Sequence, residues 1–277
     1  MRRWIWPLMA TGCVIVVLVA LLAAVQRSLI YRPLGLDAAA CRQIVGAQGF
    51  EAWRNADGRT IGYRSLAVLD DPRAPVAVLL AHGNAGCALQ RAEYAPVLRA
   101  AVADRAVSVY LVEYPGYGAR PGSPSQQALL AAAADALASI PASVPVIVLG
   151  ESLGSGVAAA TAMSHPDRVS GLLLLTPFDS LTNVAEHHYP VLPVRWLLRD
   201  RYPSEQWLRS YRGPVVVMLA GRDTIVPARF GTRLYDDYQG PKLLITAGRA
   251  NHNDLLRVLP ESSWRQALDF LVDRLAG

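Results

Sequence analysis

Ser152 stands at the centre of the pentapeptide Gly150-Glu151-Ser152-Leu153-Gly154. An apolar run, residues 144–149, precedes the pentapeptide, and a run of small residues, 155–163, follows it. This pattern predicts a strand, a sharp turn and a helix, with the serine at the apex of the turn. Glycines two positions before and after the serine let the backbone turn tightly and let strand and helix pack closely. Ser152 is therefore a candidate nucleophile, although five positions with three fixed also recur by chance.

A serine hydroxyl needs a base to take its proton before it can act as a nucleophile. The sequence has five histidines: His82, His165, His187, His188 and His252. We predict that His252 is the base, because it follows the last predicted strand, and parallel strands place their carboxyl ends on one edge of a sheet. His165 lies at the far end of the helix that follows Ser152, so it is expected to be distant. The alternative for His252 is a structural histidine.

The base needs an acid that orients it, and this acid should also follow a strand on the same edge. Asp223 comes directly after the predicted strand 215–220 and is our candidate. Asp179, which follows the strand 169–175, is a second possibility. A turn aspartate at the surface is the alternative for either residue.

An oxyanion formed during acyl transfer needs two N–H donors. We expect one from Leu153, directly after the nucleophile, and one from Asn84, in the loop His82-Gly83-Asn84-Ala85-Gly86.

Tyr114 and Tyr117 follow another strand, and we predict that they line the substrate pocket; the alternative is a plain turn at Pro115-Gly116. No metal or cofactor is predicted.

The elements that must position these residues alternate along the chain. Strands are predicted at 76–80, 107–112, 144–149, 169–175, 215–220 and 243–247. Helices are predicted at 37–45, 89–103, 123–139, 154–164, 228–237 and 262–275, the third with Ser123 as N-cap and Gln126 closing a capping box. Continuous apolar strands between helices indicate an α/β fold with a mostly parallel sheet covered on both faces. A β-hairpin at 50–66, with Asp57-Gly58 in its turn, precedes this pattern.

Residues 178–211 break the alternation, because this segment is too long for a simple crossover and too apolar for a solvated loop. We predict a small helical cap over the strand ends. The alternative is an elaborated crossover helix.

The N-terminus carries 22 residues without a charge, Trp4 to Val25, between Arg3 and Gln26. This length spans a hydrocarbon core, so we predict a transmembrane signal anchor in residues 1–27. Cleavage as a signal peptide or lipoprotein (at Cys13) fits less well. The domains are then the anchor, a connector at 28–48 and a catalytic domain at 49–277. We expect a membrane location, with the domain outside the cytoplasm and on the periplasmic side if the protein is bacterial.

The 277 residues have a net charge of +5, from 27 Lys and Arg against 22 Asp and Glu. The basic residues are scattered and almost all are arginine, so we predict no nucleic-acid partner. Three cysteines, one of them in the predicted anchor, exclude a disulfide framework and leave Cys41–Cys87 as the one conceivable disulfide in the domain. No oligomeric state is predicted.

The ordered set of motifs resembles the α/β-hydrolase superfamily, and it is most similar to the membrane-anchored serine hydrolases of the ABHD12/13/17 and Bem46-like type. The matching pieces are Tyr31-Arg32-Pro33 after the anchor, residues 82–86, 113–118 and 150–154, Gly221-Arg222-Asp223 with Val226-Pro227, and His252-Asn253-Asp254. The order Ser, Asp, His is also that of this superfamily. The cap region matches no member.

The resemblance and the residues together imply a serine hydrolase that cleaves carboxylic esters or thioesters through a Ser152-His252-Asp223 triad and an acyl-enzyme. The anchor and the apolar cap make a small lipid-like acyl ester the favoured substrate. Two alternatives are a serine peptidase or aminopeptidase of the same fold, and a non-catalytic, membrane-anchored binding protein.

Overall fold

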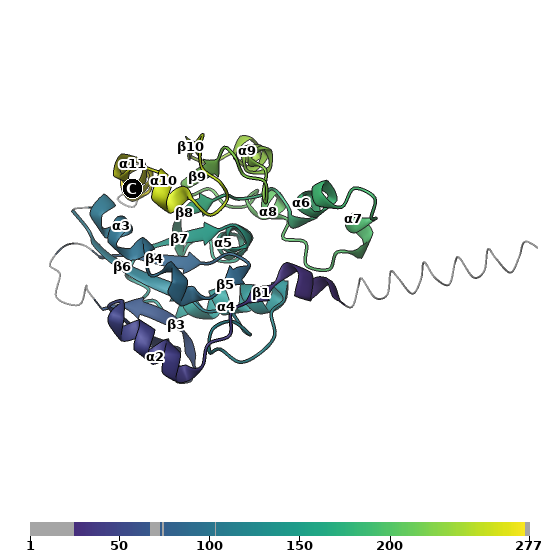
Figure 1. The fold of residues 1–277 in the computed structure, drawn as a ribbon. Coiled ribbons are helices and arrows are strands. Elements are labelled where there is room, and N and C mark those ends of the chain that lie inside the picture. The colour runs from purple at the N-terminus through teal and green to yellow at the C-terminus, as the bar shows by residue number, and fades with distance from the viewer. Residues whose placement is uncertain (1–24, 67–72, 74, 103, 275–277) are drawn as a thin grey trace, which may run out of the picture.

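The computed structural model describes residues 25–66, 73, 75–102 and 104–274 (Figure 1). The anchor predicted at 1–27 lies outside these residues, except for its last three. Within the described residues, no helix combines the length and the apolarity that a membrane crossing requires.

The described residues form one large sheet of eight strands in the order β10-β9-β8-β7-β4-β6-β3-β2. The strands are β2 (Phe50–Arg54), β3 (Thr60–Ser65), β4 (Pro75–Ala81), β6 (Ala106–Val112), β7 (Val146–Glu151), β8 (Val169–Leu175), β9 (Val215–Ala220) and β10 (Lys242–Ala247). All pairings from β10 to β6 are parallel, whereas β3 pairs antiparallel with both β6 and β2. The six predicted parallel strands and the N-terminal hairpin are therefore confirmed.

Helices cover both faces of the sheet (Figure 1). One face carries α4 (Gln126–Ala138), α5 (Leu153–Ser164) and α9 (Ala228–Asp237), and the other carries α2 (Ala38–Ala47), α3 (Tyr94–Ala101), α10 (Leu255–Val258) and α11 (Glu261–Val272). Alternate residues of a strand serve opposite faces: in β7, Val146 and Val148 join the first core, and Ile147 and Leu149 join the second. Burial on both faces explains why these strands are continuous apolar runs.

Two predicted helices differ from the observed ones. The helix expected at 89–103 is a 3₁₀ turn, η2 (Ala88–Arg91), followed by α3. The prediction of Ser123 as an N-cap is wrong: α4 begins at Gln126, and the side chain of Ser125 accepts the Ala128 N–H at 3.1 Å. Gln126 does not close a capping box, because its Oε1 accepts the Tyr202 N–H at 2.9 Å instead.

Residues 178–211, all of them described, hold three short helices: α6 (Leu181–His188), α7 (Val194–Leu197) and α8 (Ser204–Trp207). In Figure 1, α6 and α7 project beyond the sheet, and α8 lies closer to it. Tyr202 and Phe178 are fully buried and pack against α5 where Gly156 leaves room for their rings. This segment is the cap in the rest of the text.

The chain that leads into the sheet is tied to the cap. Residues 25–30 are helical. The Gln26 side chain donates to the Leu197 carbonyl at 3.3 Å and accepts the Arg199 N–H at 2.8 Å. Arg27 forms an ion pair with the buried Asp200 at 3.2 Å.

The next residues of this chain form β1 (Arg32–Pro33), which pairs parallel with β5 (Ala85–Gly86). Tyr31 connects β1 to the cap, because its hydroxyl donates to Asp200 at 2.9 Å. The segment 25–33 therefore contacts the cap at one end and the loop after β4 at the other.

Candidate active site

Ser152 occupies a strained turn between β7 and α5. Its φ of 51° and ψ of −115° lie outside the regions that non-glycine residues favour. The Ser152 N–H donates to the Leu175 carbonyl of β8 at 2.9 Å, which pins the turn to the neighbouring strand. This geometry is the nucleophile elbow that the pentapeptide predicts, and it presents the hydroxyl above the end of the sheet.

The two glycines of the pentapeptide are needed for close contact. A Cβ on Gly150 would lie 2.5 Å from the Gly154 carbonyl oxygen, and a Cβ on Gly154 would overlap the Ala81 carbonyl of β4. The start of α5 therefore packs directly on the ends of β7 and β4.

We expect Gly154→Ala to destabilise the fold by about 3 kcal/mol or more, because backbone rather than a movable side chain occupies the space. The matched control is Gly46→Ala in α2, where a new Cβ meets nothing within 4 Å and alanine favours the helix by up to about 1 kcal/mol. Thermal unfolding of both variants measures the difference. Equal melting temperatures would contradict the tight packing of the elbow.

Three side chains form a hydrogen-bonded chain at this edge of the sheet. His252 Nε2 lies 2.8 Å from Ser152 Oγ, and His252 Nδ1 lies 2.6 Å from Asp223 Oδ2. His252 comes from the loop after β10, Asp223 from the loop after β9, and both are buried. With Nδ1 donating to the carboxylate, Nε2 is free to accept the serine proton.

Backbone donors hold the second oxygen of Asp223. Oδ1 accepts the Ile225 N–H at 2.9 Å and the Val226 N–H at 2.7 Å. The carboxylate therefore keeps its orientation, with Oδ2 facing the imidazole. This support fits a group whose role is to fix the tautomer of His252.

The alternative acid, Asp179, lies elsewhere. It is fully buried and accepts hydrogen bonds from Asn183 and Arg233, each at 2.9 Å. Its carboxylate therefore neutralises an arginine of α9 and does not contact His252. The structure brings Asp223, and not Asp179, to the imidazole.

The loop after β4 lies beside Ser152: Asn84 and Ser152 line the same pocket, and a Cβ on Gly83 would lie 3.6 Å from Ser152 Cβ. The Asn84 carbonyl accepts the Arg32 N–H at 2.9 Å and the Tyr117 hydroxyl at 2.7 Å, and the Asn84 side chain donates to the Ile30 carbonyl at 2.8 Å. These contacts fix the loop at the residue expected to donate to the oxyanion. Leu153 is the first residue of α5, so its N–H has no carbonyl one turn earlier to bond.

Tyr114 and Tyr117 have no exposed surface, and neither lines the pocket at Ser152. Their rings pack on His82, with centroids 4.2 and 5.1 Å from the imidazole. The Tyr114 hydroxyl donates to the His82 carbonyl at 3.2 Å, and burial raises the pKa of this hydroxyl well above its usual range. The structure therefore corrects the expectation that these rings contact the substrate: they support the loop of Asn84 from behind.

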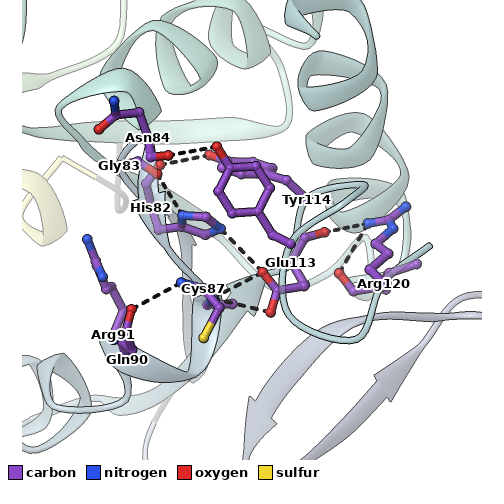
Figure 2. A network of polar contacts seen from close by, with 12 residues as sticks. His82, Gly83, Asn84, Cys87, Gln90, Arg91, Glu113, Tyr114 and Arg120 are labelled. Carbon is purple, nitrogen blue, oxygen red and sulfur yellow. Dashed lines mark hydrogen bonds and ion pairs between the residues drawn. The ribbon is translucent and has the colours of Figure 1, made fainter. Parts of the chain in front are cut away.

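Two carboxylates, the buried Glu113 and the partly buried Glu151, complete this support and were not singled out from the sequence. Glu113 accepts the Ala88 N–H at 3.1 Å and lies 3.4 Å from His82 Nε2 (Figure 2). Glu151, next to the nucleophile, forms a bidentate pair with Arg91 at 2.6 and 3.2 Å. Burial lowers the pKa of Arg91 and the Glu151 carboxylate raises it, and the net direction is upward. Their only signal in the sequence is a carboxylate at the end of a buried strand.

A pocket of about 280 Å³ opens at Ser152. Besides Ser152, Leu153 and Asn84, it is lined mainly by aliphatic and aromatic side chains of the cap and of residues 26–30: Leu29, Ile30, Phe178, Leu181, Val184, Ala185, Tyr189, Leu192, Val194, Leu197 and Leu198. A larger cavity of about 1080 Å³ between α2, β2, β3 and α4 contains none of Ser152, Asp223 and His252. The smaller pocket is therefore the one that serves the hydrogen-bonded chain.

In the part of the chain that the structure describes, no group of three or more His, Cys, Asp or Glu side chains is placed to hold a metal ion. Cys41 and Cys87 are buried free thiols.

Comparison of sequences finds several relatives. Residues 78–275 match the model of the Alpha/beta hydrolase family. An uncharacterised protein of Mycobacterium tuberculosis is 36% identical over 83% of this chain and 81% of its own length. The bem46 protein of Schizosaccharomyces pombe is 29% identical over 63% of this chain and 60% of its own. The lysophosphatidylserine lipase ABHD12 of Danio rerio is 29% identical over 57% and 46%, respectively.

Solved structures share the fold. The structure of Est1E from Butyrivibrio proteoclasticus with bound ferulic acid has a TM-score of 0.63 and 16% identity, and the match covers 82% of this chain and 100% of that one. The monoacylglycerol lipase of Paleococcus ferrophilus has a TM-score of 0.57 and 18% identity, with coverage of 73% and 96%.

Proposed function

Because the chain belongs to the alpha/beta hydrolase family, we propose that this hydrolase cleaves carboxylic ester or thioester bonds with Ser152 as its nucleophile. The observation that carries the proposal is the hydrogen-bonded chain Ser152-His252-Asp223, whose serine lines an apolar pocket. A base within 2.8 Å of the hydroxyl and a fixed carboxylate behind the base meet the geometric requirements for an activated serine.

The reaction begins when Ser152 Oγ attacks the acyl carbonyl carbon and His252 Nε2 takes the hydroxyl proton. The carbonyl oxygen becomes an oxyanion, which accepts hydrogen bonds from the N–H groups of Asn84 and Leu153. Asp223 stabilises the imidazolium without taking its proton. His252 then protonates the departing alkoxide or thiolate, which leaves an acyl-Ser152 ester.

Water completes the cycle. His252 removes a proton from a water molecule, and the resulting hydroxide attacks the acyl-Ser152 carbonyl. The second oxyanion collapses, the proton on His252 returns to Ser152 Oγ, and the carboxylic acid leaves. Besides the chain and its substrate, these steps use only water.

The pocket favours an acyl chain of moderate length as the part of the substrate that it holds. Its volume of about 280 Å³ is just below the range of about 300–1,000 Å³ for small-molecule sites. Its lining is largely aliphatic and offers few partners for a peptide backbone. Lipid-like esters are the proposed substrates, and the lipase activity in the name of the zebrafish relative is consistent with them.

The proposed location is a membrane. The uncharged residues 4–25 are long enough to span a bilayer as a helix, and the domain would then lie outside the cytoplasm.

A panel of p-nitrophenyl esters from acetate to palmitate tests the substrate class with the purified full chain. We expect turnover to rise from acetate to a medium-chain ester, and a maximum at acetate would contradict an acyl pocket.

We expect Ala185→Phe to shorten the preferred chain, because Ala185 lines the pocket and a phenyl ring there fills acyl space. The kcat/KM for octanoate should fall about tenfold or more relative to acetate, which corresponds to about 1.4 kcal/mol of lost acyl burial. Ala138→Phe, on the exposed end of α4, is the matched control and should leave the profile unchanged. An unchanged profile in Ala185→Phe would exclude this pocket as the acyl site.

A further inference from the structure

Exposed apolar side chains gather around the mouth of the Ser152 pocket. In the described part of the chain, most of the large hydrophobic side chains that are exposed come from residues 25–29, from the cap or from the loop after β9. We call the following seven residues the apolar rim: Val25, Leu29, Tyr189, Val191, Leu192, Trp196 and Ile225. Contiguous exposed apolar surface of this kind marks an interaction site more often than isolated residues do.

The rim is continuous with the pocket. Leu29, Tyr189, Leu192 and Ile225 are exposed and at the same time line the pocket that reaches Ser152. A ligand that leaves an apolar phase through the rim therefore meets mainly apolar side chains on its way to the nucleophile, with Gln26, Asn84 and His188 as the polar residues of the lining.

The most exposed members of the rim have no structural reason to be apolar. Val191 is 90% exposed and Trp196 is 85% exposed, and neither lines the pocket. Both lie in the short stretch between α6 and the end of α7, which supplies Val194 and Leu197 to the pocket wall. Tryptophan at such a position is typical of groups that sit at a membrane–water interface.

The rim also lies where the chain would enter a bilayer. The uncharged run of residues 4–25 ends at Val25, the first residue of the rim. The next residue, Gln26, holds Leu197 and Arg199 by hydrogen bonds, and Arg27 holds Asp200. Figure 1 shows this N-terminal segment at the same end of the molecule as α6 and α7. A bilayer that holds residues 4–25 is therefore held close to the rim.

We propose that the apolar rim docks on the surface of a lipid bilayer, and that the Ser152 pocket takes single-chain acyl esters directly from it. The substrate half of this statement rests on the proposed ester hydrolysis, whereas the docking half does not. The pocket accepts one chain of moderate volume, so the substrate class is a monoacyl lipid rather than an intact two-chain phospholipid.

The first test compares two substrates with the full chain reconstituted in phosphatidylcholine vesicles. The variant carries Val191→Ser and Trp196→Ser, and the control carries Met163→Ser and Val258→Ser, which are exposed apolar residues outside the rim. We expect the rim variant to hydrolyse vesicle-embedded monooleoylglycerol about tenfold or more slowly than wild type. A loss of about this size is expected when one or two large apolar side chains no longer bury their surface in the bilayer. Hydrolysis of soluble p-nitrophenyl butyrate should be unchanged, because neither residue lines the pocket.

Equal loss on both substrates, or no loss on either, would overturn the docking of the rim. The control variant should behave as wild type on both substrates. A rim variant that loses only the vesicle substrate while the control keeps it supports docking.

A second test separates docking from catalysis. In a Ser152→Ala background, brominated phosphatidylcholine should quench the Trp196 emission, measured as the difference between proteins with Trp196 and with Trp196→Tyr. Quenching without any ester turnover in the wild type would reject the proposed function and retain docking. Absence of this difference would reject docking, as would burial of the rim in a dimer of the reconstituted protein.

Discussion

Ser152→Ala should abolish covalent labelling by a fluorophosphonate probe and reduce ester turnover by about 10⁶-fold. The reason is the geometry at the elbow: Ser152 Oγ is the hydroxyl that lies 2.8 Å from His252 Nε2, at the floor of the pocket. Alanine removes the attacking atom but leaves the oxyanion donors, so only the small residual rate from binding and electrostatics remains.

Ser210→Ala is the matched control, because Ser210 is an exposed hydroxyl in the loop after α8 that only caps a backbone carbonyl. It should label and turn over as wild type. Gel fluorescence after probe treatment and the hydrolysis rate of p-nitrophenyl octanoate measure the two effects. Equal labelling of wild type and Ser152→Ala would refute a serine nucleophile at this position and favour a binding role for the fold.

Asp223→Asn should lower kcat by about 10⁴-fold while leaving the fold intact. The two backbone N–H groups of Ile225 and Val226 that now hold Oδ1 would hold the amide oxygen of asparagine in the same place. The amide NH₂ would then face His252 Nδ1 and donate to it. This selects the tautomer that carries its proton on Nε2, which cannot accept the proton of Ser152.

Asp179→Asn separates this effect from the general loss of a buried carboxylate. Asp179 is as deeply buried and also follows a strand of the sheet, but it pairs with Arg233. Its asparagine variant should lower the melting temperature and leave kcat close to that of wild type. If kcat fell equally in both variants, the assignment of Asp223 as the orienting acid would fail.

The sequence predicts most of the sheet because a strand that is buried on both faces is a continuous run of apolar residues. The runs at β4, β7, β8 and β9 are apolar at nearly every position, which indicates buried strands of a parallel sheet. Residues just beyond the ends of parallel strands must meet at one edge. That rule places Ser152, Asp223 and His252 on one edge, but it admits Asp179 as well, and the structure decides between the two aspartates.

The rest depended on contacts between distant segments, which no local pattern reports. Ser123 and Ser125 are both of a residue type that caps helices, and the structure uses Ser125, while the Gln126 side chain bonds Tyr202 in the distant cap. Similarly, an aromatic residue near an active site serves equally well as a pocket wall or as a support. In the structure, the Asn84 carbonyl accepts hydrogen bonds from the Arg32 N–H and the Tyr117 hydroxyl, so Tyr117 supports the loop of Asn84.

The cap was predicted as a segment but not as a shape, for a related reason. Its three helices are too short to show a clear period, and α7 and α8 have four residues each. What orders them is the contact with α5 and with residues 25–31.

The contacts of residues 25–33 limit how this protein can change in evolution. A spacer between a membrane and an enzyme ordinarily tolerates insertions, since only its reach matters. Here the same short stretch bonds the cap through Gln26 and Tyr31 and the loop of Asn84 through Ile30 and Arg32. A single inserted residue would shift one of these two sets of hydrogen-bonding groups away from its partners. Contacts at both ends therefore constrain the length of this stretch, and an insertion within it is expected to be less well tolerated than in an ordinary spacer.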